Sequence, residues 1–161
     1  ASVFVASTAT LRGVIEAAAF SSVWFGNDFD AGSSHIRIGE STNVQDNTVI
    51  RCTSAQGVTI GRETTVGHNV TIADCTIGDH CLVGIGSVIA PGTHIQDHVF
   101  LAASARTQPG QVLESGFFYA GAPAAKRGPL DQQKRDTITR TVRQYRLYAQ
   151  DFKSAEERFS A

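Results

Sequence analysis

The chain has 161 residues, 42% of them hydrophobic, which suits one domain with a sizeable core. Its net charge of −1 argues against nucleic acid or an anionic membrane as the main partner. No apolar run approaches the ~20 residues of a membrane span, and the start, ASVFVASTATLRG, lacks a signal-peptide pattern. Three cysteines without CxxC spacing favour a reducing compartment. We therefore expect a cytoplasmic protein or, after removal of a targeting segment, a mitochondrial matrix protein.

From about residue 8 to residue 121, an apolar side chain recurs at nearly every sixth position. The period is interrupted by a short irregularity after Phe29, a ten-residue step after Ile50 and a five-residue step after Ile72. A period of six fits neither a helix nor an ordinary strand, and it indicates a stacked repeat. The positions in the series are Leu11, Ala17, Val23, Phe29, Ile38, Val44, Ile50, Ile60, Val66, Ile72, Ile77, Val83, Ile89, Ile95, Leu101, Thr107, Leu113 and Tyr119.

The predicted fold is mainly β, a parallel β-solenoid. Each hexapeptide makes one short strand and a turn, and three of them close a triangular coil of about eighteen residues. Coils stack at the strand spacing of ~4.8 Å and bury one another's apolar side chains. Glycine, asparagine, aspartate and serine take the corners. The step at residues 51–59 predicts a loop projecting from one corner.

The end of the solenoid is predicted at FFYAGAPAAKRGP, residues 117–129, because glycine and proline interrupt the pattern there. Asp131 is then a candidate helix N-cap, and an amphipathic helix of roughly 25 residues follows. We therefore divide the single domain into a β-solenoid at 1–121 and a connecting segment plus helix at 122–161. The apolar positions of the helix are Ile138, Val142, Tyr145, Ala149 and Phe152, and its solvated face carries Arg135, Arg140, Arg143 and Lys153.

Several stretches together resemble the γ-class carbonic anhydrase family. They are SVWFGNDF, IRIGESTNVQDNTVI, VGHNVTIADCTIGD, LVGIGSVIAPG and YAGAPAAKRG, and the resemblance covers nearly the whole chain. It implies a left-handed parallel β-helix with a C-terminal helix. It also implies a homotrimer, or a heterotrimer of related chains, with zinc bound between subunits in active members.

The repeat places residues 51 and 73 in one outward column of adjacent coils. In the family both positions carry zinc-binding histidines, and a third histidine, in the VGH motif, reaches across from the neighbouring subunit. This chain has Arg51, Ala73 and His68, so one ligand of three remains. The family's RGD segment is also missing, since Asp30 and Gly32 fall on its arginine and aspartate. No cofactor is expected, although zinc bound by an altered ligand set stays open.

Three polar residues of the family's site remain in the NVQD run, namely Asn43, Gln45 and Asp46. The family places the glutamine near the metal-bound water and the aspartate against the RGD arginine across the subunit boundary. In a structural interpretation, Gln45 and Asp46 hold a corner and the interface, and His68 is an interface histidine with a hydrogen-bond partner.

Arg51 is the more informative substitution. We hypothesise that its guanidinium occupies the volume of the metal and supplies positive charge between subunits, paired with Asp46 or with Asp30 or Asp74 of a neighbouring chain. The alternative is an exposed arginine. A rebuilt zinc site could use Cys52 or Cys75, but strand alternation should turn residue 52 away from the side of residue 51. The remaining histidines, which are His35, His80, His94 and His98, are interpreted as surface residues.

Three functions remain open at this point. The first is a catalytically silent, trimeric family member that acts as a scaffold or interaction subunit. The second is an enzyme, either a carbonic anhydrase with an altered site or a hydrolase of thioesters. The third is a hexapeptide acyltransferase that uses His68 as general base, although no long loop is available to shape a coenzyme A site.

Overall fold

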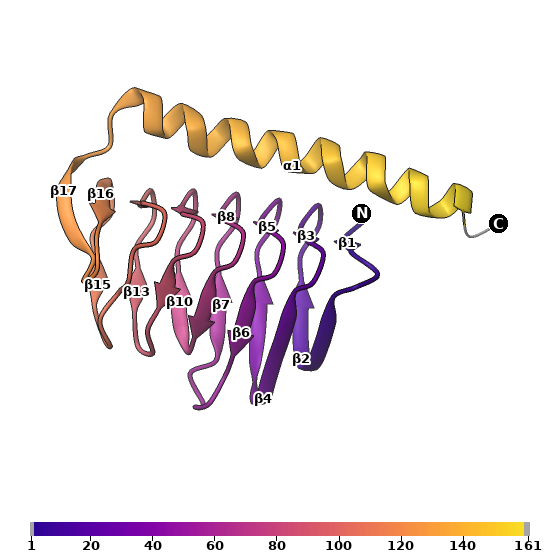
Figure 1. Ribbon diagram of the computed structural model, residues 1–161, viewed down its shortest axis with the longest axis horizontal. Coiled ribbons are helices and arrows are strands. Elements are labelled where there is room, and N and C mark those ends of the chain that lie inside the picture. Colours follow the sequence, from indigo (N-terminus) through magenta and orange to yellow (C-terminus); the bar gives the residue numbers. More distant parts are fainter. Residues whose placement is uncertain (1, 160–161) are drawn as a thin grey trace.

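The computed structural model describes residues 2–159, and it is a parallel β-solenoid with one helix lying along its side (Figure 1). The predicted mainly β class, the solenoid and the C-terminal helix are therefore confirmed. The coils stack from β1 at one end to β16 at the other, and the helix runs back along the stack toward the N-terminus.

One face of the solenoid is an eight-stranded sheet, which we call the first sheet. Each of its strands pairs with the strand one coil further on, as when Phe4 of the first strand pairs with Ser22. Its last two strands form an antiparallel hairpin in the segment predicted to end the solenoid. The strands in spatial order are β1 (Phe4–Val5), β3 (Ser22–Val23), β5 (Asn43–Val44), β8 (Thr65–Val66), β11 (Leu82–Val83), β14 (Phe100–Leu101), β16 (Phe117–Ala120) and β17 (Ala125–Pro129).

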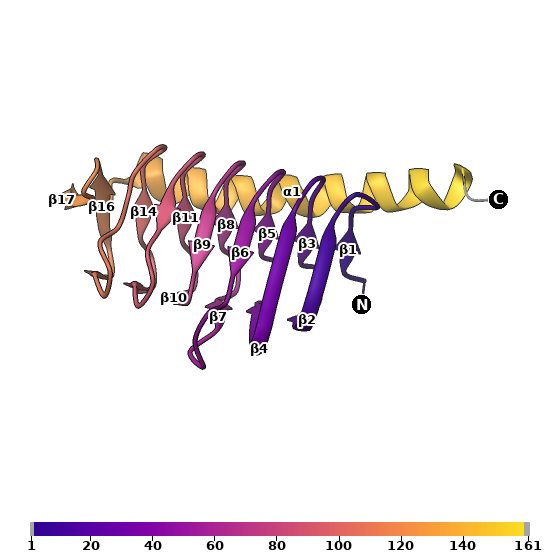
Figure 2. The same cartoon turned by 60° about the horizontal axis from the view of Figure 1, so that its bottom comes forward.

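The other two faces form a second, nine-stranded sheet, because two long strands continue around the corner between them (Figure 2). These are β2 (Thr10–Ala17) and β4 (Asp28–Ile38). The apparent irregularity after Phe29 in the repeat is thus a bent strand. The other strands are β6 (Val49–Arg51), β7 (Val58–Ile60), β9 (Thr71–Ala73), β10 (Cys75–Ile77), β12 (Val88–Ile89), β13 (His94–Ile95) and β15 (Val112–Leu113).

The core is the stack of inward side chains from successive coils. Ile50, Val66, Ile72 and Leu113 are fully buried, as the six-residue period predicts. The prediction is less accurate in the first coil, where Leu11 is exposed. The six-residue series is recognisable only from about residue 8, and the structure adds β1 before it. The first coil has no coil beneath it, and its side chains therefore remain partly in contact with solvent.

The corners are closed by hydrogen bonds and by close backbone approach. Thr42 donates its hydroxyl to the carbonyl of Gly61, and Thr48 donates to that of Gly67. A side chain at Gly61 would meet the carbonyl carbon of Gly78 at 2.6 Å, so glycine is required where these coils touch. No buried polar side-chain atom among the described residues lacks a hydrogen-bond partner.

Helix α1 (Gln132–Phe159) begins at the predicted cap, because Asp131 accepts a hydrogen bond from the Lys134 amide at 2.8 Å. Its buried positions Ile138 and Val142 face the solenoid. The helix contacts β1, β3, β5 and β8, so it covers the first sheet and leaves the second sheet uncovered. No helix of residues 2–159 has the length and hydropathy of a membrane span.

Replacing Ile72 by alanine should lower the free energy of unfolding by about 2–5 kcal/mol, because the deleted atoms leave a cavity in the stack. Ile72 is fully buried, whereas its neighbour Thr71 points outward and is exposed. Thr71→Ala, the matched control, should change stability by less than about 0.5 kcal/mol. Urea unfolding measures both. Equal effects would contradict the assignment of Ile72 to the inner stack.

Candidate functional site

The outward column on the second sheet lies where the sequence analysis placed it. Arg51 pairs in register with Ala73 on one side and with Asp30 on the other. These three residues come from β9, β6 and β4, so the column crosses three coils. The two positions at which the family resemblance implies zinc-binding histidines therefore do lie side by side.

The Arg51 side chain is held within its own chain by Asp28. One guanidinium nitrogen forms an ion pair with the Asp28 carboxylate, and the other donates to the main-chain carbonyls of Asp28 at 2.8 Å and Ile50 at 3.0 Å. Asp28 also binds Arg12 at 2.9 Å, and Arg12 reaches Asp30 at 3.3 Å. The result is a network of two arginines and two aspartates across neighbouring coils. The sequence analysis did not single out Asp28 or Arg12.

This network holds both carboxylates in their charged form. The hydrogen bond from Arg51 lowers the pKa of Asp28 below its ordinary value, and the charges of Arg51 and Arg12 add to the effect. The amide of Gly32 lowers the pKa of Asp30, with Arg12 as the second cause. The charges of the four side chains sum to zero, so the network carries no net negative charge that would attract a cation.

A zinc ion does not fit this column. Zinc in proteins is held by three or four histidine, cysteine or carboxylate donors. A guanidinium stays protonated and cannot ligate, and Ala73 has no donor atom. Among residues 2–159 no group of three or more such side chains is arranged to hold a metal ion.

His68 lies at a different place, the corner that follows β8. Its Nδ1 is 3.4 Å from a carboxylate oxygen of Asp46, and its Nε2 is 3.4 Å from the hydroxyl of Tyr145 on α1. Asp46 itself is fixed by the amide of Phe25, which donates at 3.0 Å. Burial raises the pKa of Tyr145 to about 12, with the charge of Asp46 as a further cause. The imidazole thus lies between a carboxylate and a hydroxyl, surroundings that are compatible with general-base chemistry.

The remaining polar residues of the family's site have structural partners. Gln45 donates to the side chain of Asn43 at 3.1 Å, and Asn43 donates to Thr65 at 2.9 Å. Asn43 and Gln45 are both buried. Asn43 and Gln45 thus have partners within their own chain, whereas Asp46 is turned toward His68.

The acids proposed to pair with Arg51 are engaged elsewhere within the chain. Asp46 faces His68, and Asp30 binds Arg12. Asp74 is 2% exposed and accepts hydrogen bonds from Thr53 and the amide of Ser54. Burial acts to raise the pKa of Asp74, but these hydrogen bonds outweigh it and lower the value. We therefore correct the expectation for Asp74, since a buried carboxylate that anchors a loop cannot reach another chain.

The cysteines do not rebuild a metal site. Cys52 turns to the side opposite Arg51, as alternation predicted, and its Sγ lies 3.6 Å from the carbonyl of His35. Cys75 is fully buried, and burial raises its pKa to about 12. A thiol with so high a pKa is a poor metal ligand near neutral pH.

Two histidines interpreted as scattered surface residues lie together. The rings of His80 and His98 stack at 4.9 Å, and His80 Nδ1 is 3.2 Å from a Glu63 oxygen. The sequence does carry a signal for this. Each histidine follows an aspartate, and the two pairs are one eighteen-residue coil apart.

Changing Asp28 to asparagine should lower stability at pH 7 more than at acid pH. The lowered pKa of Asp28 means that its stabilising contribution is present above its ordinary value near 3.8 and is lost as the pH falls through the folded value. Urea midpoints of the parent and D28N should therefore differ at pH 7, and the difference should shrink as the pH falls below 3.8. D151N, at an exposed residue of α1, is the control. A difference that stays constant as the pH falls would contradict the role given to Asp28.

Comparisons with known proteins agree with this architecture. The family model "Bacterial transferase hexapeptide (six repeats)" matches residues 74–107. Gamma carbonic anhydrase 2, mitochondrial, of Arabidopsis thaliana is 30% identical over 154 residues, covering 92% of this chain and 55% of the relative. Protein YrdA of Escherichia coli is 29% identical over 118 residues, covering 69% and 64%. The chain spans about half the length of the plant relatives that it matches.

Solved structures also share this architecture. A hexapeptide transferase family protein from Anaplasma phagocytophilum superposes with a TM-score of 0.88 at 26% identity, covering 93% of this chain and 89% of that one. The left-handed parallel β-helix expected from the resemblance is the fold that these neighbours share. With its repeat, its coil stack and these relatives taken together, the chain is a hexapeptide-repeat protein homologous to the γ-class carbonic anhydrases.

Proposed function

We propose that this protein is a γ-carbonic anhydrase-like chain without carbonic anhydrase activity, and that it acts in a trimer as a scaffold or interaction subunit. The observation that carries the proposal is the Arg51–Asp28 pair beside Ala73, which replaces two of the three metal ligands implied by the family. A zinc-bound water reaches a pKa near 7 only when enough ligands hold the ion. The residues of this column do not supply those ligands.

The trimer itself remains part of the proposal, and the family supports it. The second sheet, which carries the Arg51 column, is the part of the solenoid that α1 leaves uncovered. The Arg51 side chain is 40% exposed on this face although Asp28 pairs with it, so a neighbouring copy or a related chain can contact it there. In this proposal the chain keeps the surface by which family members associate and lacks the donors for the metal.

A second candidate function is supported by the His68 corner. A histidine oriented by Asp46 and facing the Tyr145 hydroxyl could act as the general base of an acyltransferase or of a thioester hydrolase. The matched family model and the Anaplasma neighbour are both described as transferases. We rank this function second because no long loop beside His68 is available to enclose coenzyme A.

The compartment is a further part of the proposal. The plant relative is a mitochondrial protein by name, and the absence of CxxC pairs suits a reducing interior. A mitochondrial matrix location therefore stands beside the cytoplasm as an alternative.

The protein purified without added zinc should contain far less than one zinc per chain, and carbon dioxide hydration should stay at the rate of buffer. The double variant Arg51→His with Ala73→His restores the implied donors opposite His68 of a neighbouring copy. It should raise the zinc content toward one per chain, measured by elemental analysis. Arg51→Lys, which adds no neutral imidazole, is the matched control. Stoichiometric zinc in the unmodified protein would refute catalytic silence.

Acetyl-CoA should produce no saturable heat in titration calorimetry if the protein is a scaffold. The variant His68→Ala should then behave like the parent protein. Saturable binding together with acyl transfer or thioester hydrolysis that is lost in His68→Ala would instead establish the second function. His94→Ala, at an exposed histidine of β13, controls for non-specific effects.

A further inference from the structure

Helix α1 presents two unlike edges to the solenoid. One edge carries Tyr145 and Tyr148, whose rings lie 5.3 and 6.5 Å from that of Trp24. The other carries Arg135, Arg143 and Arg146, which the helical period places on a side distinct from the tyrosines. The His68 corner thus lies along the aromatic edge, and the basic edge faces another part of the solenoid.

A groove runs along the basic edge. It consists of a hollow of about 200 Å³ between α1 and the stacked His80 and His98, and a hollow of about 340 Å³ between α1 and the corner residues Ser41 and Glu63. The two hollows share Thr139 of the helix. A small third hollow continues from the second, since both are lined by Arg146 and Gln150. We call these three adjoining hollows the α1 groove.

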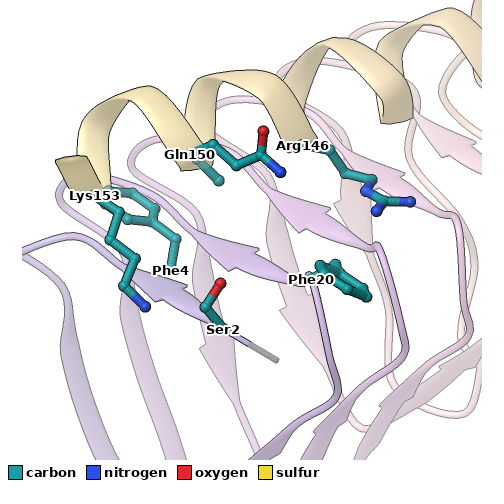
Figure 3. A pocket seen from close by; sticks show the side chains of 7 residues that line it. Ser2, Phe4, Phe20, Arg146, Gln150 and Lys153 are labelled. Atoms are coloured by element: carbon teal, nitrogen blue, oxygen red, sulfur yellow. The ribbon is translucent and has the colours of Figure 1, made fainter.

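Figure 3 shows the end of the α1 groove near the N-terminus. Arg146, Gln150 and Lys153 project from α1 on the side of Phe20. The guanidinium of Arg146 lies 4.5 Å from the centre of the Phe20 ring. The groove therefore combines cationic groups with apolar contact surface at this end.

The charge of the α1 groove is positive. None of the ion pairs within the described residues includes Arg135, Arg143 or Arg146. The acid that lines the hollows is Glu63, and it already faces His80 at 3.2 Å. A chain with a net charge of −1 thus gathers unpaired arginines along one edge of one helix.

The shape of the α1 groove suits an extended chain. From Arg135 to Gln150 the helix rises about 22 Å, at 1.5 Å per residue. An extended peptide of about seven residues covers that length at ~3.3 Å per residue. Leu147 is 52% exposed and Phe20 36% exposed, so apolar surface is interleaved with the arginines.

We propose that the α1 groove binds an acidic, extended peptide segment of a partner protein. Its carboxylates pair with Arg135, Arg143 and Arg146, and its alternate apolar side chains rest on Leu147 and Phe20. A polyphosphate or another simple polyanion would satisfy the arginines but leave the apolar surface unused, so the peptide is the better match. The proposal is independent of whether the His68 corner is catalytic, because the two surfaces lie on opposite edges of α1.

The test is fluorescence anisotropy with a labelled peptide of about eight residues in which glutamate and leucine alternate. A peptide with lysine in place of glutamate is the probe control. The groove variant is Arg143→Glu with Arg146→Glu, and circular dichroism checks its fold. The milder Arg143→Gln with Arg146→Gln replaces it if charge reversal unfolds the protein. Arg140→Glu, on the outward side of the same helix and outside the three hollows, is the matched control.

Saturable binding of the acidic peptide, weakened at least about tenfold by the groove variant and unchanged in Arg140→Glu, is the expected result. Binding should also weaken as salt concentration rises. Absence of saturable binding, or equal losses in Arg140→Glu and the groove variant, would overturn the proposal. So would binding of inorganic polyphosphate in preference to the peptide. A last outcome is that the parent does not bind the peptide and that the groove variant changes the mass measured by sedimentation. That result would overturn the proposal and assign the groove to contact with a second copy of the chain.

Discussion

The stacking of one coil on the next is the constraint on which the rest of this structure depends. Each inward side chain, such as Ile50 or Ile72, is buried because the neighbouring coils cover it. The strands pair in parallel register from coil to coil, so every outward position also becomes part of a column. A column brings together residues about twenty positions apart, and chemistry on this fold is therefore built from columns and corners rather than from local motifs.

The Arg51 column shows how one architecture can carry different chemistry. A column of imidazoles could hold a cation, because neutral nitrogen donors point into shared space. Here the same positions carry a guanidinium and a methyl group, and a neighbouring aspartate neutralises the guanidinium. The backbone register is unaffected by this exchange, since the side chains of the column point away from the core. Exchange of the outward residues in this column therefore costs the fold little.

Helix α1 divides the surface of the solenoid into regions with different properties. On its aromatic edge, Tyr145 completes the surroundings of His68. On its basic edge, Arg143 and Arg146 form the wall of a groove whose other wall is a solenoid corner. Beyond the helix, the uncovered second sheet carries the charged network of Arg51. A single chain thus separates a charged outward face, a candidate proton-transfer corner and a candidate peptide groove.

The sequence by itself determined the solenoid, most side chains of its inner stack, the cap of the helix at Asp131 and the absence of metal donors at positions 51 and 73. It could do so because a six-residue period shows which side chains point inward and which outward residues lie in one column. The identity of each outward residue then shows whether it can bind a metal. The tertiary structure alone decided that Asp28 pairs with Arg51, and that Tyr145 meets His68 across 77 positions. It also decided which edge of α1 faces which corner. These contacts depend on side-chain conformations and on how the helix packs across the coils, and neither quantity is encoded in the period of the repeat.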